Sequence, residues 1–125
     1  MMNDKQSERR LELRVRFEHP VKCMMPEVIF EGRAVNLSGD GLYLQSPVPL
    51  EVGTEMAIMF SYSTQGDMPF LALAEVIWCQ DGPEEKSDGT SLIGLQFRNL
   101  GRQKQTLLAW HVQQLVLAGQ MLPAL

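Results

Sequence analysis

The stretch VIFEGRAVNLSGDGLYLQ, residues 28–45, decides the fold class of this chain. Its first part, residues 28–35, has the alternation of an extended strand, and in the segment 42–45 the leucines Leu42 and Leu44 fall on one face. Between them, residues 36–41 are dense in the Asn, Ser, Gly and Asp residues that form turns. Two strands joined by a tight polar turn predict an antiparallel hairpin.

The same period of two recurs on both sides of this hairpin, and polar turns separate the segments. Beyond residue 99 the apolar spacing becomes helical, which predicts a helix over 102–118 that Gly119 ends. The face expected to pack on the core carries Leu107, Leu108, His111, Val112, Leu115 and Val116. We therefore expect a mainly β fold, a six-stranded antiparallel barrel with a C-terminal α-helix, because closure removes exposed strand edges. The expected strands lie within residues 21–25, 28–35, 42–45, 56–60, 70–79 and 92–97.

Length and composition describe an ordinary globular protein. The chain has 125 residues, of which 45% are hydrophobic and 21% charged, so we expect a single domain and exclude a disordered chain. No export signal is seen, and no segment approaches the roughly 20 apolar residues of a membrane span, so a cytoplasmic protein is expected. Cys23 and Cys79 then fit buried reduced thiols.

Positive charge is concentrated near the N-terminus. Residues 1–22 hold six of the eleven Lys and Arg residues against four acidic residues, a balance of +2, while the whole chain carries −4. We interpret residues 1–18 as a flexible arginine-rich arm and residues 19–125 as the barrel with its helix. The acidic remainder would repel a nucleic-acid polymer, but the arm suits a small anionic ligand.

Catalytic and metal chemistry find little support. His111 falls on the apolar helix face, where a structural role is more common than that of a general base, and His19 has no catalytic partner in the pattern. The cysteines lack metal-ligand spacing, and Ser38 lacks the strand-to-helix context of a nucleophile. We therefore expect no enzyme activity, no metal site and no cofactor.

Two short motifs carry recognition chemistry. Arg10 and Arg14 form R-x-x-x-R with Arg9 directly before it, and a guanidinium group can hold guanine or phosphate through two hydrogen bonds or stack on a purine. Asn36 and Ser38 begin an N-x-S-x-x-G turn that ends at Gly41. Each motif alone also has a common structural explanation. Spaced arginines usually solvate a surface, and turns of this kind, with a glycine such as Gly41 at a site of positive φ, join many strands.

In this order the motifs resemble those of the PilZ domain family. The resemblance includes RRLELRV at residues 9–15, NLSGDG at 36–41, EVIW at 75–78 and IGLQF at 93–97, followed by a helix. It implies a six-stranded PilZ-type barrel that binds the bacterial second messenger cyclic di-GMP and has no catalytic activity.

The resemblance also implies roles for particular residues. The arm would close on the ligand with Arg9, Arg10 and Arg14, and the turn would contribute Asn36, Ser38 and Gly41. Asn36 stands where some family members have Asp, and an amide does not offer guanine two anionic acceptors. An arginine at position 9 implies two stacked ligand molecules per chain, while a solvent ion pair with Glu8 or Glu12 is the alternative for Arg9.

Trp78 follows a strand, at a point where some similar domains hold an aromatic beside the bases. A tryptophan in the core or at the rim of the barrel is an equally good reading of the sequence.

The helix carries an outer apolar stripe at Trp110, Leu117 and Met121, which predicts a homodimer contact or a surface for a downstream protein partner unless residues 122–125 cover it.

Three function classes follow from the sequence. The first is a stand-alone cyclic di-GMP receptor that transmits binding by arm ordering and a changed surface. The second is a PilZ-like adaptor of pilus or flagellar machinery that acts by protein interaction without ligand. The third is a small-barrel binder of RNA or single-stranded DNA, which the acidic remainder disfavours.

Overall fold

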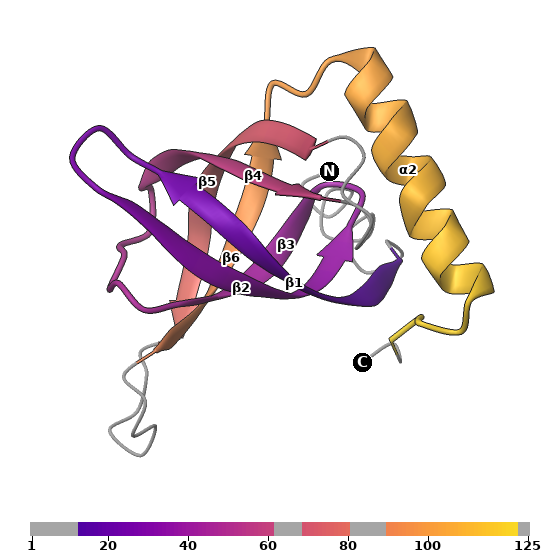
Figure 1. The fold of residues 1–125 in the computed structure, drawn as a ribbon, viewed down its shortest axis with the longest axis horizontal. Coiled ribbons are helices and arrows are strands. Elements are labelled where there is room, and N and C mark those ends of the chain that lie inside the picture. Colours follow the sequence, from indigo (N-terminus) through magenta and orange to yellow (C-terminus); the bar gives the residue numbers. More distant parts are fainter. Residues whose placement is uncertain (1–12, 62–68, 81–89, 123–125) are drawn as a thin grey trace, which may run out of the picture.

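The computed structural model describes residues 13–61, 69–80 and 90–122. These residues form a closed antiparallel barrel in which the strands follow the order β1-β2-β3-β6-β5-β4, and helix α2 lies along one side (Figure 1). The predicted fold class is confirmed. The elements are β1 (Arg14–Met24), β2 (Ile29–Ser38), β3 (Gly41–Ser46), β4 (Glu55–Ser61), β5 (Pro69–Gln80), β6 (Ser91–Arg98) and α2 (Arg102–Leu117).

Alternating side chains fill the barrel. On β4 every second residue is buried, and the same rhythm runs along β1 and most of β5. Helix α2 adds Leu108 and Val112 to this core, whereas Leu107, expected on the same face, is 51% exposed. Leu115 and Val116 of the helix are partly buried against the same core.

Strand β1 begins earlier than the sequence suggested. We expected the arm to continue to residue 18, but Val15 and Phe17 are buried in the core and Arg14 pairs with Ser38 of β2. The reason is the alternation of these two apolar residues with Arg14, Arg16 and Glu18, which lets the strand bury one face and leave its charges outside. Residues 1–12, the rest of the expected arm, lie outside the described residues.

The end of α2 directs the chain back to the barrel. Gly119 has φ 84°, and its N–H donates to the carbonyl of Val116 while the N–H of Gln120 donates to the carbonyl of Leu115. This is a Schellman ending with glycine in the left-handed position, as the sequence predicted. The following residues, 120–122, lie beside the start of β1 (Figure 1).

The cysteines are not joined by a disulfide. Cys23 is buried, and burial raises the pKa of its thiol to about 11. Cys79 is only half-buried, so the expectation of a buried thiol holds for one of the two residues.

Candidate functional site

One row of residues crosses the outer wall of the barrel. Asn36 of β2 lies opposite Tyr43 of β3, Tyr43 opposite Gly94 of β6, and Gly94 opposite Trp78 of β5. The strand register shifts just before Asn36 and just before Trp78, and each shift marks a β-bulge. Bulges re-aim side chains, so this wall of the barrel is locally reshaped around the row.

Arg14 lies over this row. Its Nη1 donates to Oδ1 of Asn36 at 2.5 Å, and its guanidinium carbon stands 4.1 Å from the centre of the Tyr43 ring. Both partners are neutral, so the positive charge of Arg14 is held in place without being neutralised by either of them. A fixed guanidinium of this kind is suited to an anionic or purine ligand.

Trp78 is held by a glycine and an aromatic ring. Its indole meets Tyr43 edge to face at 4.8 Å between ring centres. A Cβ atom at Gly94 would stand 2.3 Å from Nε1 of Trp78, so only glycine leaves room for the indole to cross β6. Trp78 is half-buried and lines the wall rather than the core.

Ser38 organises the turn between β2 and β3. Its side chain is fully buried, its hydroxyl donates to Oδ1 of Asp40 at 2.9 Å, and it accepts the N–H of Asp40 at 3.3 Å. The carbonyl of Asp40 accepts the N–H of Phe97 at 2.8 Å. Ser38 therefore holds Asp40 in position, whereas we had expected its hydroxyl to face a ligand.

Gly41 is needed for a different reason from the one expected. We had attributed it to a backbone conformation with positive φ, but among the described glycines only Gly53 and Gly119 have one. A Cβ atom at Gly41 would stand 2.0 Å from the carbonyl oxygen of Leu95. Close packing of β3 on β6, rather than turn conformation, requires glycine here.

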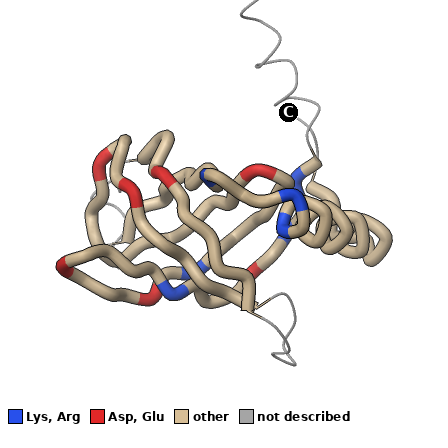
Figure 2. The backbone as a smooth tube through the Cα atoms, turned by 90° about the horizontal axis from the view of Figure 1, so that it is seen from above, with Lys and Arg blue, Asp and Glu red and all other residues tan. Residues whose placement is uncertain are grey.

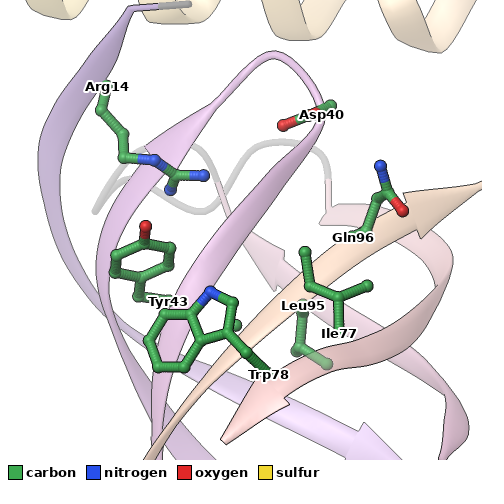
Figure 3. Close-up of a pocket in the computed structure, with 8 residues that line it drawn as sticks. Arg14, Asp40, Tyr43, Ile77, Trp78, Leu95 and Gln96 are labelled. Atoms are coloured by element: carbon green, nitrogen blue, oxygen red, sulfur yellow. The ribbon is translucent and has the colours of Figure 1, made fainter. Parts of the chain in front are cut away.

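These residues surround a shallow pocket of about 160 Å³, in which Arg14 points between Asp40 and Tyr43 (Figure 3). Of the predicted site residues, Arg14, Asn36 and Trp78 gather here, Ser38 and Gly41 lie in the turn behind it, and Arg9 and Arg10 lie outside the described residues. The lining residues are Arg14, Asp40, Tyr43, Ile77, Trp78, Gly94, Leu95 and Gln96.

Sequence reasoning missed Asp40, Tyr43 and Gln96. Tyr43 had a signal, since it is an aromatic residue between the inward-facing Leu42 and Leu44 and must therefore point outward. Asp40 and Gln96 had none, because the pairing of β3 with β6 brings them to the pocket from separate parts of the chain.

The described residues contain no group of three or more His, Cys, Asp or Glu side chains placed to hold a metal ion. In the same part of the chain, no helix has the length and apolarity that a membrane crossing requires.

The fold and the site define a small antiparallel barrel with a pocket on its outer wall. The model of the PilZ domain matches residues 8–114, and the chain belongs to this family. A comparison with curated protein sequences found no significant match.

Solved structures share the fold at low sequence identity. The PilZ domain of YcgR from Escherichia coli, solved with c-di-GMP, has a TM-score of 0.69 and 18% identity, covering 89% of this chain and 94% of that one. The inhibitor of motility MotI/DgrA from Bacillus subtilis has a TM-score of 0.71 and 14% identity over 86% of this chain.

A tetrameric PilZ protein from Xanthomonas campestris, self-assembled via a helical bundle, has a TM-score of 0.59 and 21% identity over 73% of this chain. This chain spans 51% of the Bacillus protein and 48% of the Xanthomonas protein.

Proposed function

We propose that this chain is a receptor for cyclic di-GMP that acts through ligand binding rather than catalysis. The observation that carries the proposal is Arg14, whose guanidinium is fixed over Tyr43 and Asn36 at a pocket walled by Trp78. Membership of the PilZ family and the c-di-GMP bound by the YcgR domain support the same ligand.

The chemistry of the pocket matches the two halves of this ligand. Cyclic di-GMP carries two guanines and two phosphates, with about one negative charge per phosphate. Arg14 can bind a phosphate or a guanine edge, and the aromatic wall of Tyr43 and Trp78 offers a face or edge for a base. At about 160 Å³ the pocket is smaller than the roughly 300–1,000 Å³ of an enclosing ligand site, so most of the ligand would lie outside it.

An exposed ligand needs further contacts, which we assign to Arg9 and Arg10. Ordering an arm costs about 1–2 kcal/mol per residue in backbone entropy, and each charge-assisted hydrogen bond returns roughly 1.5–3 kcal/mol. Arm closure would therefore accompany binding and change the surface offered to a downstream partner. With Arg9 as a third guanidinium, the site could hold two stacked ligands and offset their roughly four negative charges.

Asp40 can complete the recognition of guanine. The Oδ1 atom of Asn36 already accepts from Arg14, so this amide is poorly placed to accept from the guanine N1 and N2 donors. Asp40 lines the same pocket, and Ser38 and the N–H of Phe97 hold it there. A carboxylate is an acceptor only, which is what those guanine donors require.

Calorimetric titration with cyclic di-GMP tests the proposal, with GTP and a short oligonucleotide as controls. The receptor predicts saturation near two ligands per chain and no comparable heat with either control. Arg9→Leu should still bind but fall towards one ligand, and an unchanged ratio would remove Arg9 from the site. No heat with cyclic di-GMP would favour the adaptor, and heat with the oligonucleotide alone would favour the nucleic-acid binder.

We also propose that α2 contacts a second copy of the chain. Trp110 is 61% and Leu117 73% exposed, and with Leu107 and Gln114 they follow the spacing of three and four residues typical of paired helices. Residues 105–125 contain no Asp, Glu, Lys or Arg, and Figure 2 shows α2 without charge beyond its first turn. Two copies of an acidic protein can approach along this face without repulsion.

Sedimentation tests this contact. The wild type should dimerise with rising concentration, and Trp110→Glu should remain monomeric because it places a charge in the seam. Ala109→Glu adds the same charge at an exposed helix position away from the seam and should still dimerise. A wild type that is monomeric at high concentration, with or without ligand, would contradict the proposal.

A further inference from the structure

The residues after α2 complete the barrel beside Arg14. The N–H of Arg16 donates to the carbonyl of Gln120 at 2.8 Å, and the N–H of Leu122 donates to the carbonyl of Arg14 at 2.9 Å. Val15 and Met121 form an antiparallel bridge between these two bonds. Gln120–Leu122 thus adds a short strand to the start of β1, and we name this segment the C-terminal strap.

The strap occupies an edge of β1 that the barrel strands leave open. One edge of β1 pairs with β2, and the opposite edge pairs with β4 only over Lys22–Met24. The residues at the start of β1 pair with β2, at Arg14 with Ser38 and at Arg16 with Asn36. Of the described residues, the strap alone hydrogen-bonds to the opposite edge of this part of β1.

The local sequence directs the strap to this place. Gly119 ends α2 in a left-handed conformation that turns the chain back, and Pro123 disfavours helical backbone at Leu122, the residue before it. The outcome is an extended segment of three residues, which is what a strand edge accepts. Gly119 does not line the pocket beside Arg14, so its role is to direct the chain.

We infer that the strap is a positioning element that holds Arg14 in its ligand-binding geometry and couples the pocket to α2. Arg14 is the first residue of β1, and the strap binds its backbone carbonyl while its side chain reaches Asn36 and Tyr43. Without the strap, the backbone that carries this side chain would be paired on one edge only. The inference rests on the proposed function for its ligand, but the geometry it concerns exists without ligand.

A pair of substitutions at Leu122 in the full chain isolates the strap. Leu122→Pro removes the N–H that donates to the carbonyl of Arg14, and proline is compatible with extended backbone. Leu122→Ala also shortens the leucine side chain but keeps this N–H, so the two variants differ mainly in the hydrogen bond. We expect Leu122→Pro to weaken cyclic di-GMP binding roughly fivefold to tenfold, the factor of one to two backbone hydrogen bonds, and Leu122→Ala to bind like wild type. The melting temperature of Leu122→Pro should fall only a few degrees below that of Leu122→Ala, which shows that the barrel still folds.

A second readout needs no ligand. In the NMR spectrum of the free protein, the Arg14 side-chain N–H signal should be displaced by the Tyr43 ring, and Leu122→Pro should move it towards the position of a solvated arginine. Amide exchange at Arg16 should rise in the same variant. If wild type binds no ligand but these signals change, the positioning role stands and the proposed ligand fails.

Non-additivity separates positioning from general support. In an Arg14→Ala background, Leu122→Pro should cause no further loss of affinity, because its effect passes through Arg14. The inference is overturned if Leu122→Pro leaves the Arg14 signal and the affinity unchanged, or if the two substitutions weaken binding additively.

Discussion

The two tryptophans lie in regions of opposite character. Trp78 lies on the barrel wall beside Tyr43 (Figure 3), which it meets edge to face. A bulge in β5 and the missing side chain of Gly94 also fix its position. Trp110 is 61% exposed on α2, on a face without charged residues. The fixed aromatic wall suits the ligand that we propose, whereas the exposed apolar face of α2 suits the second copy of the chain that we propose.

Arg14→Ala should have the largest effect and should act on the pocket alone. We expect a loss of roughly 2–5 kcal/mol in the free energy of cyclic di-GMP binding, because a fixed charged contact disappears, with no effect on self-association through Trp110. Calorimetry and sedimentation on one sample measure both. Arg33→Ala removes an exposed cation of β2 outside the pocket and serves as the control. Equal loss in the two variants would mean that net charge, not the site, drives binding.

Gly94→Ala tests whether the Trp78 wall is built around a glycine. The added Cβ would meet the indole, and we expect a loss of about 1–3 kcal/mol in the free energy of unfolding together with a shifted Trp78 fluorescence. Gly101→Ala, at the N-cap of α2, meets open space and should cost less, at most about 1 kcal/mol for the poorer cap. Similar losses at both glycines would show that the clash with the indole does not explain the effect.

Ser38→Ala should act more weakly and only through the pocket. It removes the hydroxyl that holds Asp40, so we expect a loss of about 0.5–1.5 kcal/mol in ligand binding, less than for Arg14→Ala. Titration of both variants measures the order. An effect of Ser38→Ala as large as that of Arg14→Ala would place the hydroxyl on the ligand itself.

The smallest effect that we expect is a pH dependence of stability, which arises from two histidines at the contact between β1 and α2. His19 stacks on Phe17 at 4.5 Å and His111 meets the same ring at 6.1 Å. Burial lowers the pKa of both, helped by Arg33 at His19 and by His19 at His111. A lowered pKa means that the unfolded chain binds more protons, so stability is full above the ordinary pKa of 6.5 and declines as pH falls from there towards the folded values.

Thermal unfolding between pH about 7.5 and about 5 measures this decline. On acidification, the melting temperature of the wild type should fall further than that of His111→Gln, because glutamine cannot be protonated as histidine can. Equal losses in the two proteins would place the pH dependence elsewhere in the chain.

Much of the fold could be predicted from the sequence because its signals are local. The alternation of apolar and polar residues predicted the strands, the helical spacing after residue 99 predicted α2, and Gly119 predicted where α2 ends. The motif residues Arg14 and Asn36 could be named, and the structure joins them by a hydrogen bond. The start of β1 was misplaced because its arginines suggested a mobile arm, although Val15 and Phe17 carried the strand pattern.

The set of elements and the motif residues could therefore be predicted from local sequence, since both depend on neighbours within a few residues. The folded barrel was needed to see that Asp40 and Gln96 line one pocket, that Gly41 makes room for a carbonyl of β6, and that the C-terminal strap lies beside Arg14. These contacts join residues far apart in the chain. Their positions follow from barrel closure and from the register of each strand pair, which no short window of sequence contains.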